Sequence, residues 1–266
     1  MSTKIRFILR WILARPSLYA LNRGLYILSL NGMGILNYED NKISGEDSFL
    51  RKITKSFGEN AVVLDVGANV GNYANLIKKL SPKTKVYSFE PHPKTFEILA
   101  ENARKNGYFA FNLGCGKEKG KLELYDAENN DGSENASLFK EVIEGISGRK
   151  AIAYSVDVID LDSFLVEKGI EKVNLLKIDV EGNEYRVLEG VKNALRKGII
   201  EVIHFEFNEM NVVSRTFLKD FYEILSDYRL FRMLPNGLVA IDKYKPIFCE
   251  IYAFQNLVAI HKAAIE

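Results

Sequence analysis

The sequence predicts an α/β protein with a doubly wound, mainly parallel sheet, a terminal antiparallel strand and an N-terminal helical arm. Apolar runs without polar alternation, typical of strands buried on both faces, recur between segments with helical spacing. This alternation indicates a sheet covered by helices on both faces. The chain has 266 residues, 47% of them apolar and 27% charged, which is enough for one large domain. We place that domain at residues 59–266 and the arm at residues 1–58.

The first half of the domain contains three expected strands. The β-branched run at residues 61–66 predicts the first, and a helix follows it. Residues 85–90 predict the second strand. Residues 93–107 have apolar side chains at helical spacing and end at a glycine, a common helix stop. Residues 109–114 predict the third strand.

The second half continues the pattern and then changes it. Residues 173–179 and 201–207 predict strands four and five, with a helix between them. Residues 228–234 and 250–260 have no clear helix between them, so we expect a final antiparallel pair. The polar, glycine- and asparagine-rich stretch at residues 126–150 is expected to be a lid or acceptor-binding loop. A merely mobile loop is the alternative.

Composition excludes some classes of partner. The formal net charge is +1, so no overall field attracts nucleic acid. Cys115 and Cys249 are far apart and have neither metal-ligand nor redox spacing. We therefore expect a reduced, cytoplasmic protein.

The N-terminal arm is basic and apolar. Residues 1–38 contain five basic residues and no acid, and Arg6 and Arg10 interrupt the run "IRFILRWILA". This run is too short and too charged to span a bilayer. Two interpretations stay open. The arm, with Trp11, lies on the inner face of a membrane, or it packs as a helix on the domain or on a second subunit of an oligomer.

A glycine-containing turn joins the first strand to the first helix in "VLDVGANVGNYA". Gly67 and Gly71 permit a tight turn, and the helix start offers N–H groups to an anion. Asn69 occupies the second glycine position of the dinucleotide fingerprint, which argues against a nicotinamide-dependent oxidoreductase. Glu90 ends the second strand, where an acid accepts hydrogen bonds from ribose hydroxyls. Asp65 ends the first strand and either faces a cationic ligand or braces the turn.

Four segments together resemble the FkbM-type family of S-adenosylmethionine-dependent methyltransferases. They are "VVLDVGANVGNYA", "VYSFEPHPKTFEILAENARKNG", "LLKIDVEGNEYRVLEG" and "EVIHFEFNE", in this order along the chain. The resemblance implies a class I methyltransferase fold, Rossmann-like in topology, and S-adenosylmethionine as cofactor. It implies O-methylation of a hydroxyl on a small molecule, foremost a carbohydrate such as a nucleotide-linked sugar or a polysaccharide unit. A polyketide-type acceptor and a non-catalytic S-adenosylmethionine-binding module are the alternatives.

The resemblance also assigns cofactor contacts. Asp65, Gly67, Asn69 and Gly71 are expected at the methionine end and Glu90 at the ribose. The segment around Gly114 and Cys115 is expected to border the adenine. The full expected cofactor-binding set is Asp65, Gly67, Asn69, Gly71, Asn72, Glu90, Pro91, Cys115 and Asp179. Glu46, in "SGEDSF", is expected near the methionine part, while Ser44 and Asp47 of the same segment fit a helix-capping box.

Side chains at the ends of strands four and five are the candidates for activating the acceptor. A hydroxyl becomes a good nucleophile when a base removes its proton or when a divalent cation lowers its pKa. Asp179, Glu206 and Asn208 are expected to converge there, and their oxygens suit Mg²⁺ or Mn²⁺. His204 or Glu206 is the candidate base in a metal-free alternative, and Glu181 completes the candidate catalytic set. Simpler roles remain open: Asp179 and Glu181 as caps of the following helix, and His204 as a core residue.

Overall fold

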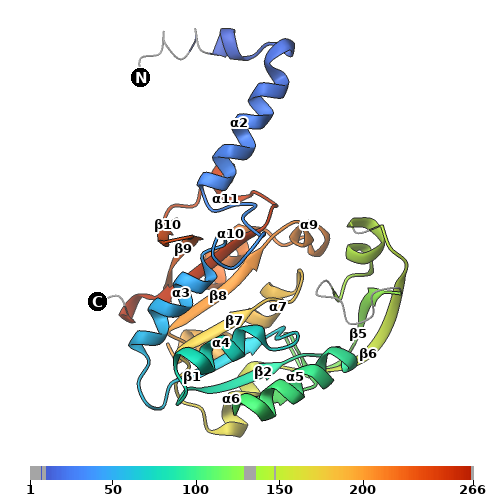
Figure 1. The fold of residues 1–266 in the computed structure, drawn as a ribbon, viewed down its shortest axis with the longest axis vertical. Coiled ribbons are helices and arrows are strands. Elements are labelled where there is room, and N and C mark those ends of the chain that lie inside the picture. Colours follow the sequence, from blue (N-terminus) through green and yellow to red (C-terminus); the bar gives the residue numbers. More distant parts are fainter. Residues whose placement is uncertain (1–6, 8–9, 129–135, 147, 265–266) are drawn as a thin grey trace.

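The structure is a computed structural model that describes residues 7, 10–128, 136–146 and 148–264. An eight-stranded sheet has the order β10-β9-β11-β8-β7-β1-β2-β3 (Figure 1). Strands β3, β2, β1, β7 and β8 are mutually parallel, and β11 then pairs antiparallel with both β8 and β9. The predicted parallel sheet with terminal antiparallel strands is therefore confirmed. The strand bounds are β1 (Val62–Val66), β2 (Lys85–Phe89), β3 (Phe109–Phe111), β7 (Leu175–Ile178), β8 (Val202–Phe207), β9 (Tyr228–Leu234), β10 (Gly237–Ala240) and β11 (Gln255–His261).

Helices cover both faces of this sheet and enclose two apolar cores. In β1 the side chains alternate, so that Leu64 and Val66 enter one core and Val63 enters the other. The first core is closed by α6 (Leu161–Lys168), α7 (Glu184–Glu189), α8 (Lys192–Arg196) and α10 (Leu218–Ile224). The second is closed by α3 (Glu46–Ile53), α4 (Asn72–Leu80) and α5 (Pro93–Asn106). Two short helices complete the packing: α11 (Pro246–Cys249) adds Cys249 to the first core, and α9 (Met210–Ser214) packs Met210 and Val213 against a smaller cluster with Val142 and Ile143.

A second, three-stranded sheet was not predicted. It has the order β4-β6-β5, with bounds β4 (Gly114–Cys115), β5 (Gly120–Ala127) and β6 (Ala151–Ile159). The polar stretch at residues 126–150 connects β5 to β6 and includes a short π-helix (Val142–Ile146). Its central part, residues 129–135, lies outside the described residues, so its role as a lid stays a prediction.

The N-terminal arm contains α2 (Tyr19–Gly32), which projects from the sheet domain at the top of Figure 1. Within the described residues, no helix combines the length and apolarity needed to cross a bilayer. Helix α3 also lies in the predicted arm, yet its Phe49 and Leu50 are buried in the second core. The division of the chain at residue 58 stays a prediction.

The turn after β1 passes directly over the end of β7, and glycine makes this possible. Gly67 has φ +75°, and a Cβ there would overlap the backbone carbonyl of Asp179. We expect Gly67→Ala to destabilise the fold by about 3 kcal/mol, because it adds both backbone strain and a clash. Urea unfolding measures this loss. Gly58→Ala is the control, since no heavy atom lies within 4 Å of a Cβ at that position. Equal stability of the two variants would contradict the close approach.

Candidate active site

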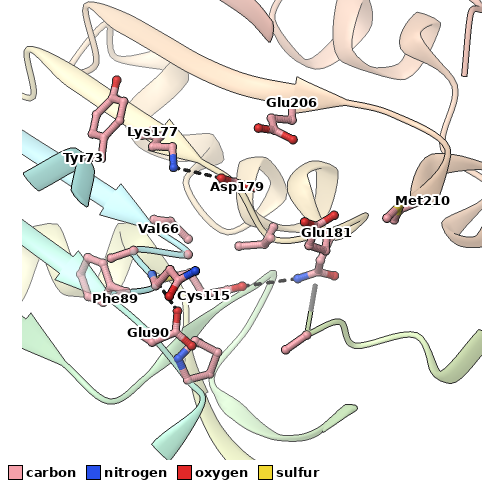
Figure 2. A pocket seen from close by; sticks show the side chains of 18 of the residues that line it. Val66, Tyr73, Phe89, Glu90, Cys115, Lys177, Asp179, Glu181, Glu206 and Met210 are labelled. Atoms are coloured by element: carbon pink, nitrogen blue, oxygen red, sulfur yellow. Dashed lines mark hydrogen bonds and ion pairs between the residues drawn. The ribbon is translucent and has the colours of Figure 1, made fainter. Parts of the chain in front are cut away.

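A cavity of about 590 Å³ lies at the carboxyl ends of β1, β2, β7 and β8. This is the edge at which open α/β sheets bind ligands. Figure 2 shows Glu90 on one side of the cavity and Lys177, Asp179 and Glu206 toward the other. Most of the predicted site residues line it. They are Gly67, Asn69, Asn72, Glu90, Pro91, Cys115, Asp179, Glu181, Glu206 and Asn208.

The glycine-containing turn leaves the first turn of α4 open to the cavity. Gly71 is the N-cap of α4, with φ +88° and no side-chain hydrogen bond at the cap. Asn72, the first residue of the helix, lines the cavity. The first N–H groups of a helix have no acceptor within the helix, so this end can bind an anion.

Glu90 is held in a fixed orientation by two backbone donors. The N–H of Asn69 donates to Oε2 at 2.9 Å, and the N–H of His92 donates to Oε1 at 2.8 Å. Burial raises the pKa of Glu90 to about 7, although these two hydrogen bonds act in the opposite direction. Each carboxylate oxygen still has a second lone pair with which to accept a hydrogen bond from a ligand.

The wall beside Glu90 is apolar. It consists of side chains from the second sheet, from the connection between β5 and β6, and from the segments that follow β2 and β3. These are Pro91, Leu113, Cys115, Leu124, Leu138, Val156 and Val158. Burial raises the pKa of the Cys115 thiol well above its usual range, so this thiol behaves as a small apolar group. An uncharged aromatic ring would fit against this wall.

The opposite side of the cavity carries a cluster of carboxylates around one ammonium group. Lys177 Nζ lies 3.0 Å from Asp179 Oδ2 and 4.9 Å from the ring centroid of Tyr73. Burial opposes the charged form of Lys177, but Asp179, Asp65 and Glu46 outweigh burial and raise the pKa of this lysine. Asp65 is fully buried and does not line the described part of the cavity. Burial raises the pKa of Asp65 to about 6.

Glu181 and Glu206 lie near this cluster, and neither is in an ordinary carboxylate environment. Burial, followed by the charge of Asp179, raises the pKa of each well above its usual value. Asp179 is therefore close enough to interact with Glu206, although its direct partner is Lys177 and not the glutamate. A carboxyl group with a raised pKa is suited to proton transfer near neutral pH.

The structure places His204 behind the cavity wall. Its side chain is 1% exposed and packs against Phe49, with ring centroids 5.6 Å apart. Nδ1 lies 3.2 Å from the Tyr73 hydroxyl and Nε2 lies 3.0 Å from Asn256 Oδ1. Burial, and then Lys177, lower the pKa of His204 to about 4. The neutral His204 ring is within hydrogen-bonding distance of Tyr73 and Asn256, which line the cavity, and so supports both side chains. This environment fits the role of a core residue better than the role of a base.

The expected metal ligands Asp179, Glu206 and Asn208 all line the cavity, and their role as ligands stays a prediction. Across the described part of the chain, no group of three or more His, Cys, Asp or Glu residues is arranged to hold a metal ion. Asn208 instead accepts a hydrogen bond from the N–H of Met210 at 3.0 Å. The ammonium of Lys177 already provides a fixed positive charge beside Asp179.

Two capping predictions differ from the structure. Glu184, not Asp179 or Glu181, accepts hydrogen bonds from the N–H groups of Val180 (3.2 Å) and Gly182 (3.1 Å). The expected capping box between Ser44 and Asp47 is absent. The N-cap of α3 is Gly45, and Asp47 pairs with Arg51 on the same helix. Ser44 Oγ still accepts a hydrogen bond from the N–H of Glu46, at 3.4 Å.

The fold and the site together define a nucleoside-binding α/β protein of the methyltransferase type. The strand order, the turn after β1 and the acid after β2 are the features that define this class. Residues 65–232 match the Methyltransferase FkbM domain, and the chain belongs to that family. The match runs from the end of β1 into β9.

Several characterised relatives are similar to this chain. Methyltransferase sdnD of Sordaria araneosa is 30% identical over 50% of this chain and 61% of its own length. Hexuronic acid methyltransferase AglP of Haloferax volcanii is 31% identical over 58% of this chain and 59% of its own length. The 2-O-methyltransferase NoeI of Sinorhizobium fredii is 25% identical over 66% of this chain and 76% of its own length. The chain thus spans about three fifths of the first two relatives.

Lys177 allows a direct test of the carboxylate cluster. We expect Lys177→Met to destabilise the protein by about 3 kcal/mol at pH 8, because it leaves buried carboxylates without a cation. The folded pKa of Asp65 is raised, so the folded state binds more protons than the unfolded state and loses stability as pH rises from about 4 through 6. Loss of Lys177 raises that folded pKa further. The free energy of unfolding of Lys177→Met should therefore lie closer to that of the wild type at pH 5 than at pH 8.

Urea unfolding at both pH values measures the difference. Lys168→Met is the matched control, because Lys168 pairs with Glu167 on the surface, and it should change stability by less than about 0.5 kcal/mol. A deficit for Lys177→Met that is the same at pH 5 and pH 8 would contradict the cluster as described.

Proposed function

We propose that the protein is an S-adenosylmethionine-dependent O-methyltransferase that acts on a hydroxyl group of a carbohydrate. The observation that supports this most is that one cavity contains both Glu90, a carboxylate suited to ribose hydroxyls, and the charged cluster of Lys177 and Asp179 on the opposite side. Family membership supports the same cofactor and reaction type. S-adenosylmethionine supplies a methyl group on a sulfonium, which needs no further activation.

The residues that line the cavity fit the three parts of this cofactor. The open first turn of α4, with Asn69 and Asn72, suits the carboxylate of the methionine part. Glu90, fixed by two backbone N–H groups, suits the ribose hydroxyls. The apolar wall around Cys115 and Val158 suits the adenine ring. Asp65 braces the end of β1 from below the cavity, since its carboxylate is fully buried.

The charged cluster supplies the acceptor half of the mechanism. Asp179, fixed by its ion pair with Lys177, places a negative charge beside Glu206. Glu206 accepts the hydrogen bond from the acceptor hydroxyl and removes its one proton, because burial and the charge of Asp179 raise the pKa of this carboxyl and so make it a stronger base. Glu181 is buried nearby, and its charge also raises the pKa of Glu206. The ammonium of Lys177 stabilises the negative charge that develops, in the place where a metal-dependent enzyme would use a cation.

The charge of the lining favours a neutral or amino sugar over an acidic one. Among the described lining residues, Lys177 is the one Lys, Arg or His side chain. The carboxyl groups that surround the cavity are those of Asp40, Glu46, Glu90, Asp179, Glu181, Glu206 and Glu209. The names of two relatives, a hexuronic acid methyltransferase and a 2-O-methyltransferase, support a carbohydrate acceptor. A uronic acid carboxylate would be repelled here, because Lys177 is already paired.

Variants at Glu90 and Glu206 separate cofactor binding from catalysis. We expect Glu90→Gln to weaken S-adenosylhomocysteine binding by about tenfold or more, since it removes charge-assisted hydrogen bonds. Glu206→Gln should keep that affinity and lower kcat by about a hundredfold or more, since it removes the base. Calorimetry and a labelled-methyl assay give the two readouts. Glu189→Gln, at a surface ion pair with Lys117, is the control for both.

The acceptor class is tested with labelled S-adenosylmethionine and a panel of sugars. The panel contains nucleotide-linked neutral, amino and uronic sugars. We expect the labelled methyl group to be transferred to the neutral or amino sugars and not to the uronates. Preferred methylation of a uronate would overturn the proposal that the acceptor is a neutral or amino sugar. Normal turnover by Glu206→Gln would show that another residue takes the proton. Tight cofactor binding without transfer to any hydroxyl would favour a non-catalytic binding module.

A further inference from the structure

Helix α2 is almost entirely uncovered. Of its fourteen residues, Leu30 is the one that is buried. The helix projects from the domain (Figure 1), and large apolar side chains are exposed along its length. Among them Leu25 is 49% exposed and Leu28 is 67% exposed. The segment before it continues this surface, with Trp11 64% exposed and the Arg15 guanidinium 3.9 Å from the Trp11 ring centroid.

The exposed apolar side chains of α2 lie on two sides of the helix. At 3.6 residues per turn, Leu21, Leu25 and Leu28 form one stripe, while Tyr19 and Tyr26 belong to the other. A helix that is apolar over most of its circumference requires an apolar environment on more than one side. With fourteen residues, α2 is too short to cross a bilayer, so it suits a shallow position at a surface.

The positive charge of residues 1–38 indicates which kind of surface helix α2 binds. Residues 1–38 contain five basic residues and no acid. A second copy of residues 1–38 would bring positive charges together with no carboxylate among these residues to pair them. An anionic lipid surface would instead attract these charges, and tryptophan and tyrosine are the aromatic residues favoured at the boundary between lipid and water.

Helix α11 of the domain also exposes large apolar side chains. Ile247 is 78% exposed and Phe248 is 54% exposed. Arg232 connects this helix to the base of the arm. Its Nη2 donates to the Phe248 carbonyl at 3.1 Å, and its Cγ lies 3.4 Å from where a Cβ of Gly34 would be. Helix α11 therefore lies near the base of the arm.

We propose that α2, residues 10–18 before it and α11 bind the surface of an anionic lipid bilayer. The two stripes of α2 are covered by acyl chains, and the arginines pair with lipid phosphates. Tyr38 and Asp40, which follow α2 along the chain, line the cavity. A bound bilayer would thus lie close to the cavity, which under the proposed function suits a carbohydrate carried at the membrane. Lipid binding itself does not depend on that function.

Vesicle co-sedimentation of the full chain tests this proposal. We expect binding to phosphatidylcholine vesicles that contain phosphatidylglycerol, much weaker binding to pure phosphatidylcholine, and loss of binding at high salt. Leu25→Glu/Leu28→Glu should lower the bound fraction by about tenfold or more, since it puts two carboxylates into the apolar stripe. Arg15→Glu/Arg23→Glu should abolish the preference for the anionic lipid.

The control is Ile98→Glu/Val166→Glu, which places the same charges on the exposed faces of α5 and α6, remote from α2 in Figure 1. All variants should retain the melting temperature and the affinity for S-adenosylhomocysteine. Binding that does not distinguish anionic from neutral vesicles would overturn the proposal. So would a dimer, detected by light scattering, that is lost in Leu25→Glu/Leu28→Glu while vesicle binding is absent. Loss of methyl transfer with intact vesicle binding would count against the proposed function alone.

Discussion

The ammonium group of Lys177 lies 3.0 Å from Asp179, among carboxyl groups that come from β1, the end of β7 and α3. Three acids at the edge of one sheet would repel one another without a cation between them. Because Lys177 is itself buried, it depends on these acids as much as they depend on it. The candidate acceptor site is therefore a balanced charge cluster, and removing any one member changes the protonation of the others.

The backbone geometry makes this cluster part of the same cavity as the glycine-containing turn. Gly67 lets the turn after β1 lie against the carbonyl of Asp179. The cofactor half and the acceptor half of the cavity therefore meet through backbone contact at this point. Glu90 is then oriented by N–H groups on either side of it, Asn69 in the turn and His92 after β2. The cofactor half of the cavity is thus organised by backbone, while the acceptor half is organised by side-chain charge.

This contrast explains what could be predicted from the sequence. Local patterns identified the parallel strands, the turn at Gly67 and the acid Glu90, because each depends on residues close in the chain. The second sheet was missed, although Tyr154, Val156 and Val158 alternate as in a strand, because the polar stretch beside it dominated the composition. Lys177 and Asp179 are two residues apart, and the period of a strand puts them on the same face, but the sequence does not show that Lys177 is buried. The burial of His204 behind the cavity wall likewise depends on residues distant in the chain.

A crystal structure with S-adenosylhomocysteine is the most direct test of the central claim, that one cavity holds both cofactor and acceptor groups. The account predicts ribose hydroxyls hydrogen-bonded to Glu90, adenine against the wall at Cys115, and the sulfur facing Asp179 and Glu206. An adenosine part bound away from Glu90, or a sulfur that faces away from Asp179, would contradict it.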